Sequence, residues 1–308
     1  MGAGTLLEAI GNTPLVRFEH AHFKHVELWA KLEYLNPGGS VKDRAALAII
    51  EAGEKSGALT RDKILIDATS GNTGIAYAMI GAARGYRVEL VIPKNVSAER
   101  KRIVQAYGAT IRYSSEFEGS DGAIRLVREL VAAHPERYFY GDQYSNPANW
   151  KKHYATTGAE IWRQTRGRVT HFVACVGTSG TLMGTGRRLK KENPKVRVVE
   201  VQPEEALHGI EGVKHMPSSL QPSIWDESFA DERVLVKTED AYEMTRLLAR
   251  MGYFAGYSSG AALKAALRVA AGLTRGVVVM IFPDSGERYL TTHLWEQGDD
   301  LFVTKPRH

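Results

Sequence analysis

A lysine in a glycine-rich turn is the residue of this chain best suited to covalent chemistry. Lys42 stands near the end of residues 36–44, NPGGSVKDR. The Pro-Gly-Gly run predicts a tight turn, and Ser40 is placed to cap a helix that begins near Val41. The positive end of that helix dipole would favour the neutral amine of Lys42, the form that attacks carbonyl groups and makes Schiff bases. A solvated surface lysine would fit the same turn, so this stretch alone does not decide.

Two runs of small polar residues could bind anions, because each follows a predicted buried strand and opens a predicted helix. They are residues 69–74, TSGNTG, and residues 177–181, GTSGT. At the carboxyl end of a parallel strand, hydroxyl groups, backbone N–H groups and a helix N-terminus together suit a carboxylate or a phosphate. An ordinary capped loop is the alternative for the first run. A third run, residues 256–260, GYSSG, is by itself typical of a plain helix N-cap.

The spacing of the glycines in the second run argues against a nucleotide site. Glu200 lies about twenty residues further on, as an acidic residue does in dinucleotide sites, but Gly177 and Gly180 do not make a G-x-G-x-x-G pattern. The pattern G-x-x-x-x-G-K-[ST] is absent from the sequence. We therefore expect residues 177–181 to hold a single phosphate. An imine-forming lysine and a cup for one phosphate together indicate pyridoxal phosphate, whose aldehyde and phosphate need both.

The composition is that of a globular protein that acts on small molecules. Its 308 residues, 44% hydrophobic and 24% charged, are enough for two domains or one large α/β unit. The net charge of +5 is modest and the basic clusters lack an aromatic-rich motif, so we expect an anionic small-molecule substrate and no nucleic acid. No apolar run reaches membrane-spanning length, no secretory signal is visible and there is one cysteine, which together predict a cytoplasmic protein without membrane contact.

The remaining chemistry-bearing side chains predict no further centre. Cys175 lies in the apolar run 171–176 and is expected to be a buried, unreactive thiol. His20, His22 and His25 have no regular spacing on one element, so no metal site is expected. Asp284 follows a predicted strand, where it could line a pocket or cap the next turn.

Strand-like and helix-like segments alternate along nearly the whole chain, which predicts an α/β fold with parallel sheets and helices on both faces. The predicted strands are 26–32, 63–68, 87–93, 110–114, 138–143, 171–176, 196–201, 233–237 and 277–282. The predicted helices are 41–56, 74–85, 97–107, 120–133, 148–165, 182–192, 239–251 and 259–271. The irregular stretch 203–231 is too long for an idle connection, so we expect it to be functional.

Six motifs in this order resemble the fold type II, or β-family, pyridoxal-phosphate enzymes, and within them the cysteine synthases, over residues 7–292. The motifs are 11–15, GNTPL; 36–44, NPGGSVKDR; 69–74, TSGNTG; 143–149, QYSNPAN; 177–181, GTSGT; and 257–260, YSSG. The resemblance implies a tryptophan synthase β-like fold, with two parallel-sheet α/β domains and the cofactor in the interdomain cleft. It implies a smaller mobile domain at 41–147, a larger one at 1–40 plus 148–308, and a homodimer.

The resemblance also implies a role for individual residues toward pyridoxal 5′-phosphate and substrate. Lys42 would hold the cofactor as a Schiff base and, once displaced, remove the substrate α-proton, while Asn72 would bind the 3′-oxygen of the ring. Ser258 would bond the pyridine nitrogen. The phosphate cradle would be Gly177, Thr178, Ser179, Gly180 and Thr181, with Ser179 standing where many relatives have glycine. The substrate carboxylate would be bound by Thr69, Ser70, Thr73 and Gln143.

A hydroxyl at Ser258 favours elimination chemistry, because unlike a carboxylate it does not keep the pyridine nitrogen protonated and the ring is then a weaker electron sink. We therefore expect loss of a leaving group from the β-carbon of an activated serine, O-acetylserine or O-phosphoserine, followed by addition of sulfide or thiosulfate. The products would be L-cysteine or S-sulfocysteine. The alternatives on the same fold are a cystathionine β-synthase-type enzyme, a hydroxyamino-acid dehydratase and a non-catalytic paralogue.

The segments 202–205, QPEE, and 209–217, GIEGVKHMP, resemble the cysteine synthase B branch. Relatives in that branch carry a basic residue near the position of Lys214, and in some of them it contacts the phosphate of O-phosphoserine while others accept thiosulfate. Lys214 is thus expected at the pocket mouth, where it would favour an anionic leaving group or sulfur donor. A solvent-facing loop lysine is the alternative.

Overall fold

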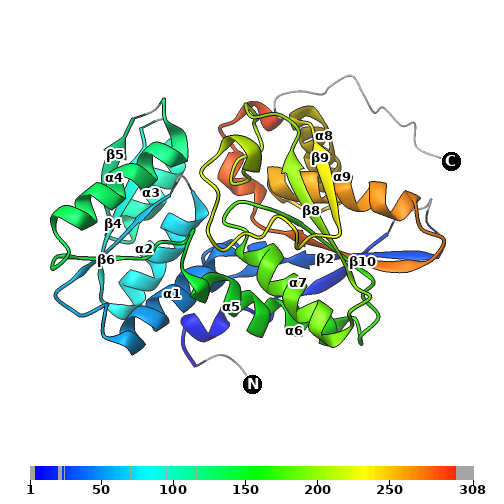
Figure 1. Ribbon diagram of the computed structural model, residues 1–308. Helices are drawn as coiled ribbons and strands as arrows, with labels where there is room; N and C mark the ends of the chain where they lie inside the picture. The colour runs from blue at the N-terminus through cyan, green and yellow to red at the C-terminus, as the bar shows by residue number, and fades with distance from the viewer. Residues whose placement is uncertain are drawn as a thin grey trace.

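The chain folds into two α/β halves, each built around its own sheet (Figure 1). The computed structural model describes residues 4–19, 23, 25–69, 71–94, 96–115 and 117–295. Figure 1 shows the four-stranded sheet on the left and the six-stranded sheet on the right. Whether residues 41–147 move as one body against the rest stays a prediction.

The smaller sheet is wholly parallel, and its strands lie in the order β5-β4-β3-β6. The strands are β3 (Ile64–Ala68), β4 (Arg87–Pro93), β5 (Thr110–Ser114) and β6 (Tyr138–Tyr140). The helices packed around this sheet are α1 (Lys42–Ser56), α2 (Asn72–Arg84), α3 (Ala98–Ala106) and α4 (Gly119–Ala133).

The larger sheet is mixed, with the order β1-β2-β10-β7-β8-β9. Its strands are β1 (Leu15–Phe18), β2 (Val26–Leu32), β7 (His171–Cys175), β8 (Arg197–Pro203), β9 (Glu232–Val236) and β10 (Gly276–Phe282). Its helices are α5 (Pro147–Ala155), α6 (Thr157–Gln164), α7 (Gly180–Glu192), α8 (Thr238–Arg250) and α9 (Tyr257–Ala271). All its neighbouring strands are parallel except β1, which pairs antiparallel with β2.

The central strands of both sheets are buried on both faces, since successive residues of a strand point to opposite sides and both sides are covered. In β10, Val278 and Met280 pack with α8 and α9, whereas Val277 and Val279 pack with α6 and α7 on the other face. The smaller sheet is covered by α1 and α2 on one face and by α4 on the other. Each fully buried large apolar side chain contributes roughly 1.5–3 kcal/mol to this core. The predicted α/β class with two sheets is thus confirmed.

Two predicted elements differ in detail. The edge strand β1 was not expected, because it is short and only one of its four residues is buried. The single helix expected at 148–165 is divided at Thr156 into α5 and α6. There the Thr156 hydroxyl donates to the Lys152 carbonyl oxygen at 2.7 Å, a local bond that competes with regular helix geometry.

Four charged side chains are buried together where α1 meets the larger half. Arg44 of α1 forms paired bonds to Glu33 at 2.7 and 2.8 Å and to Glu160 of α6 at 2.7 Å each, and Lys31 of β2 bonds Glu160 at 2.6 Å. Two cations and two anions balance, and each charge has close partners, which offsets the cost of removing them from water. This buried ion cluster fixes α1, and with it Lys42, two residues before Arg44.

The predicted motif at 11–15 completes the buried ion cluster. The Thr13 hydroxyl donates to Glu33 Oε1 at 2.6 Å, and the Asn12 backbone N–H donates to Glu160 Oε1 at 3.0 Å. The Lys31 ammonium donates to the Thr13 carbonyl oxygen at 2.6 Å. The sequence GNTPL therefore acts here as a support for the cluster.

We predict that Glu160→Gln lowers the free energy of unfolding by about 3–5 kcal/mol, because it leaves two buried cations with one anion. Burial alone would raise its pKa, but Arg44 and Lys31 lower the pKa of Glu160 from 4.5 to about 2. Its stabilisation is therefore complete above pH 4.5 and is lost as the pH falls toward 2. Urea unfolding at several pH values should show this acid-dependent loss in the native protein and not in the variant.

The matched control is Glu192→Gln, which removes one partner of the partly exposed Arg188–Glu192 pair on α7. Such pairs contribute at most about 1 kcal/mol. If the two variants lose the same stability, the buried ion cluster does not have the importance given to it here.

Candidate active site

The end of β10 and the start of α1 meet at Lys42. The Val41 N–H donates to the Pro283 carbonyl oxygen at 2.8 Å, and Ser40 pairs with Asp284 in an isolated antiparallel bridge. The Ser40 hydroxyl accepts the Lys42 backbone N–H at 3.2 Å, but the residue at the cap position is Val41, which makes no side-chain cap, so the predicted Ser40 cap is wrong in detail. The helix itself begins at Lys42.

The side chain of Lys42 lies in a setting that favours its neutral form. Burial lowers the pKa of Lys42, and the charge of Asp284 raises it again in part. The sequence predicted the direction of this shift but attributed it to the helix dipole, whereas burial is the main cause. Within the described residues, the Lys42 Nζ makes no hydrogen bond or ion pair, so the amine is available for covalent chemistry.

The turn before Lys42 is held from two sides. The Gly38 N–H donates to the Asp43 carboxylate at 2.5 Å, and the Arg288 guanidinium donates to the Gly38 carbonyl oxygen. Gly39 has φ +79°, in the left-handed region that glycine enters without strain. The motif 36–44 thus places Lys42 between a tight turn and Arg44 of the buried ion cluster. The Asp43 carboxylate holds the turn in place through its bond to Gly38.

The first anion-binding run closes around the start of α2. The Thr69 hydroxyl accepts the N–H groups of Gly71 at 3.2 Å and Gly74 at 3.1 Å. The Thr73 hydroxyl donates to Gln143 Oε1 at 2.7 Å, and Gln143 Nε2 donates to the Ala68 carbonyl oxygen at 2.7 Å. Three predicted carboxylate-binding residues therefore meet in one place. The fourth, Ser70, lies outside the described residues.

The second run lies between the end of β7 and the start of α7. A Cβ on Gly177 would lie 2.3 Å from the Gly212 carbonyl oxygen, so only glycine fits there. Ser179 has φ +67°, which explains physically why glycine suits this position, and its buried hydroxyl has no partner among the described residues. The first N–H groups of a helix lack intrahelical partners, so the start of α7 offers donors for an anion.

Two residues without a predicted role support this phosphate loop. Asn149 Nδ2 donates to the Thr178 hydroxyl at 3.0 Å and to the Gln143 carbonyl oxygen at 2.9 Å, so it joins the two anion-binding runs. The hydroxyl of Thr181 lies 3.4 Å from His153 Nε2. Burial lowers the pKa of His153 to about 3, so its ring is neutral. Asn149 stands inside the motif QYSNPAN, whereas no pattern singled out His153.

Ser258 lies in the first turn of α9, where its carbonyl oxygen accepts a hydrogen bond from the Cys175 thiol at 3.3 Å. This contact places Ser258 against the end of β7, directly before the phosphate loop. Cys175 is only partly exposed, and burial raises the pKa of its thiol to about 12. The thiol therefore stays protonated near neutral pH, as expected for an unreactive cysteine.

Asp284 faces the site instead of capping the following turn, so one of the two predicted alternatives is wrong. Its Oδ2 accepts hydrogen bonds from Asn72 Nδ2 and from the Tyr289 hydroxyl, both at 2.6 Å. The cap of the next turn is Ser285, whose hydroxyl accepts the Glu287 N–H at 3.3 Å. Asn72 and Asp284 come from different halves, so their hydrogen bond joins the two halves.

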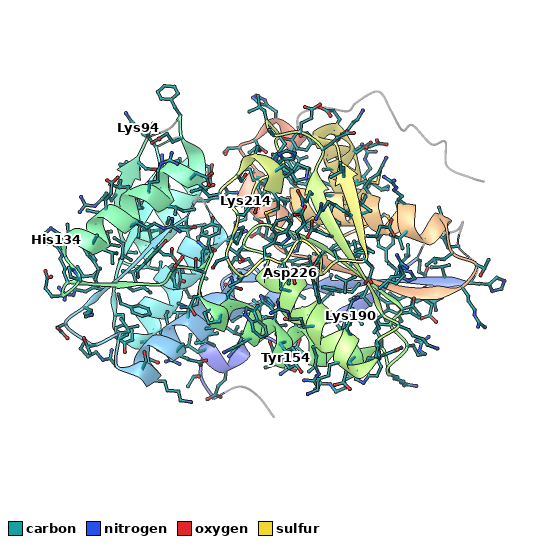
Figure 2. The ribbon with its side chains drawn as sticks, in the orientation of Figure 1. Lys94, His134, Tyr154, Lys190, Lys214 and Asp226 are labelled. Carbon is teal, nitrogen blue, oxygen red and sulfur yellow. The ribbon has the colours of Figure 1, made fainter. Side chains whose placement is uncertain are left out.

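Lys214 lies between the two halves (Figure 2) and is only 7% exposed, so the solvent-facing alternative does not hold. Its ammonium bonds Asp121 of α4 at 2.9 Å and lies 5.2 Å from the centre of the Tyr144 ring. Its backbone N–H donates to the Val176 carbonyl oxygen at 2.8 Å, next to the phosphate loop. Whether Lys214 binds substrate stays a prediction.

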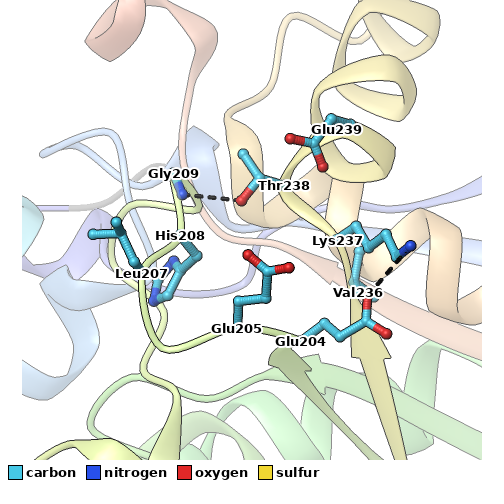
Figure 3. Close-up of a pocket in the computed structure, with 9 residues that line it drawn as sticks. All are labelled: Glu204, Glu205, Leu207, His208, Gly209, Val236, Lys237, Thr238 and Glu239. Carbon is cyan, nitrogen blue, oxygen red and sulfur yellow. Dashed lines mark hydrogen bonds and ion pairs between the residues drawn. The ribbon is translucent and has the colours of Figure 1, made fainter.

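A separate cavity of about 260 Å³ lies between residues 204–209 and 236–239 (Figure 3). Its wall includes Glu204, Glu205 and Glu239, and the Gly209 N–H donates to the Thr238 hydroxyl at 3.0 Å across it. None of the predicted site residues lines this cavity. In the part of the chain that the structure describes, no group of acidic, histidine or cysteine side chains could hold a metal ion.

Comparison with known proteins identifies the family. The family described as pyridoxal-phosphate dependent enzyme matches residues 6–284. The chain belongs to these enzymes, within the cysteine synthase family. A cysteine synthase of Aquifex aeolicus is 55% identical over 304 residues, which cover 96% of this chain and 93% of that protein.

Two further proteins are similar to this pyridoxal-phosphate enzyme, one in sequence and one in both sequence and fold. Cysteine synthase B of Salmonella typhimurium is 46% identical over 97% of each chain, as the predicted branch requires. The crystal structure of a cysteine synthase from Entamoeba histolytica superimposes with a TM-score of 0.92 at 37% identity, covering 98% of this chain and 93% of the other. The predicted fold type II architecture is confirmed.

The cofactor of this pyridoxal-phosphate enzyme is pyridoxal 5′-phosphate, and the residues present fit it. Asn72 Oδ1 and Ser179 Oγ are buried without a partner within the described ranges, and burial favours the neutral amine of Lys42. An amine can bind an aldehyde, the amide oxygen of Asn72 can accept from the ring hydroxyl group, and the Ser179 hydroxyl can donate to a phosphate. A bare glycine backbone at Gly177 and the start of α7 complete the phosphate donors.

We predict that Gly177→Ala weakens cofactor binding about tenfold or more, equivalent to about 1.4 kcal/mol, because the added methyl group would push the phosphate loop away from Gly212. Titration of the cofactor-free protein with pyridoxal phosphate, followed by absorbance, measures this affinity.

Gly272→Ala is the matched control, since a Cβ there would be 3.6 Å from its nearest neighbour, an ordinary contact. Equal affinities of the two variants would show that residues 177–181 do not hold the phosphate.

Proposed function

We propose that this protein is a cysteine synthase, which replaces the β-substituent of an activated serine by a sulfur nucleophile. The observation that carries the proposal is one chain of contacts that connects the predicted pieces. The charge of Asp284 raises the pKa of Lys42, and its carboxylate accepts a hydrogen bond from Asn72. The backbone carbonyl oxygen of Asp284 accepts the Gly256 N–H at 3.0 Å, two residues before Ser258. On the other side, Thr73, Gln143, Asn149 and Thr178 form one hydrogen-bonded path.

Pyridoxal phosphate, when bound, supplies an aldehyde that joins amines and a ring that withdraws electrons from the substrate α-carbon. Lys42 would hold the cofactor through its Nζ and, once displaced, would take the α-proton at the same atom. Residues 177–181 would hold the phosphate, and Asn72 and Ser258 would orient the ring. Thr69, Ser70, Thr73 and Gln143 bind the substrate carboxylate, which fixes the α-proton relative to Lys42.

We propose that the two halves close over the substrate, because the predicted carboxylate-binding run and Asn72 belong to the smaller half while residues 177–181 belong to the larger. Closure of residues 41–147 onto the rest excludes water from the reactive intermediate. We further propose that the protein works in the cytoplasm as a homodimer. Its single cysteine suits a reducing compartment. None of the described helices combines the length and hydrophobicity of a membrane span.

We predict that Lys42→Ala abolishes turnover and the visible absorbance of lysine-bound pyridoxal, because the Schiff base needs the Lys42 amine. Cysteine formation from O-acetylserine and sulfide, together with an absorbance scan, tests both. Lys55→Ala, at the exposed end of the same helix, should be coloured and active.

An active, normally coloured Lys42→Ala protein would rule out the assignment. Native protein that makes cystathionine from homocysteine but no cysteine from sulfide would favour the cystathionine-type alternative instead.

The identity of the leaving group and sulfur donor depends on Lys214. We propose that its ammonium favours an anionic partner, O-phosphoserine or thiosulfate, at the mouth of the cleft. Lys214→Ala should lower kcat/KM for O-phosphoserine about tenfold relative to O-acetylserine, a difference of about 1.4 kcal/mol. Asp121→Asn should shift the preference the opposite way, because it frees the ammonium from its carboxylate partner.

Lys237→Ala removes an exposed lysine of the same half and serves as the control. A ratio of the two serine esters that stays the same in all three variants contradicts a role for Lys214 in specificity.

A further inference from the structure

Asp284 is a buried carboxylate without a role in the reaction described so far. It is 1% exposed and lies directly after β10. Its Oδ2 accepts two hydrogen bonds, from Asn72 and Tyr289, whereas its Oδ1 has no partner among the residues that the structure describes. A buried carboxylate oxygen left unpaired is costly and is retained where a charge is needed nearby.

The backbone places Asp284 beside the catalytic lysine. Ser40 and Asp284 pair directly, and the next contact joins Val41 to Pro283 at 2.8 Å, one residue before Lys42. Of the groups described, Asp284 is the one whose charge acts on Lys42, and it raises the pKa of the lysine against the lowering effect of burial.

The other charged or titratable groups facing Asp284 are Tyr289, Arg100 and Arg288. Burial raises the pKa of Asp284, and the hydrogen bonds from Tyr289 and Asn72 and the two arginine charges oppose that rise. These donors stabilise the charged carboxylate beside Lys42.

The chemistry creates a need for such a carboxylate. When Lys42 takes a proton from the substrate, its Nζ becomes an ammonium inside the protein, and a buried unpaired ammonium costs several kcal/mol. We propose that Asp284 is a positioning residue for Lys42, whose carboxylate is the buried counter-charge that allows the ammonium form to exist in the closed cleft. This inference rests on the proposed function and adds a residue to it.

The test uses the full-length protein freed of cofactor and measures how fast added pyridoxal phosphate attaches covalently at different pH values. In this step the neutral Nζ attacks the aldehyde carbon, a C=N bond replaces the C=O bond, and the carbonyl oxygen leaves as water with the two protons of the amine. The pH midpoint of the rate therefore reports the proton on Lys42. Activity of the loaded enzyme is not needed for this measurement.

In Asp284→Asn the midpoint should move to lower pH by about one unit, because the ammonium loses its counter-charge and releases its proton more readily. Tyr289→Phe keeps the carboxyl group but removes one donor to its charged form. It should move the midpoint in the same direction by a smaller amount, and it keeps the proposal testable if the first variant does not fold.

Asp67→Asn is the matched control, since Asp67 is another fully buried carboxyl group of the cleft region whose charge does not act on Lys42. Its midpoint should equal that of the native protein. A midpoint unchanged in both Asp284→Asn and Tyr289→Phe overturns the proposal, even if these variants are less stable. Native protein that attaches no cofactor at all would instead overturn the proposed function.

Discussion

Four charges removed from water together hold α1, the helix that begins at Lys42, against the larger half. Arg44 binds both Glu33 and Glu160, and Lys31 neutralises the remaining charge of Glu160. These groups come from β2, the turn after it, α1 and α6, so one polar centre connects both halves of the molecule. A centre of this kind tolerates little displacement, because each partner that shifts leaves a buried charge unpaired. Because Arg44 can move little, Lys42, two residues before it, is held in place as well.

The same reasoning applies on a smaller scale around Lys42. Burial shifts the amine toward its neutral form, which can attack an aldehyde, and a nearby carboxylate keeps the protonated form within reach. A lysine that serves first as nucleophile and then as base needs both forms to be accessible. Apolar surroundings alone would favour the neutral amine and make the protonated form inaccessible. Here the conflict is resolved by the end of β10, which brings Asp284 beside the lysine through backbone pairing.

Local sequence patterns predicted the parts of the fold and site that local physics determines. Residues 87–93 and 110–114 are rich in β-branched and other strand-forming side chains, and both strands have the predicted bounds, although most of 110–114 is not buried. The glycines and hydroxyl side chains of residues 177–181 predicted an anion-binding loop. In contrast, β1 is an exposed edge, and its short pattern carries too little hydrophobic alternation to be seen. Likewise, no residue near Thr156 predicted that the helix expected at 148–165 would be divided into α5 and α6.

The missed site features depend on contacts between distant residues. Asp284 bonds Asn72 across 212 positions, and Lys214 bonds Asp121 across 93, so neither partner could be read from its own neighbourhood. The cause of the pKa shift at Lys42 was missed for a similar reason, since burial is a property of the assembled cleft. Ser179 stands where many relatives have glycine, and its left-handed backbone explains why glycine suits this position.

Two ion pairs cross the cleft with opposite polarity. Arg100 of α3 meets Glu211, and Asp121 of α4 meets Lys214, so each half contributes one cation and one anion. A slide or rotation that exchanged the partners would set Arg100 against Lys214 and Asp121 against Glu211, two repulsions in place of two attractions. The crossed arrangement therefore favours the observed pairing over one with the partners exchanged, and dissolved salt weakens this preference by screening the charges.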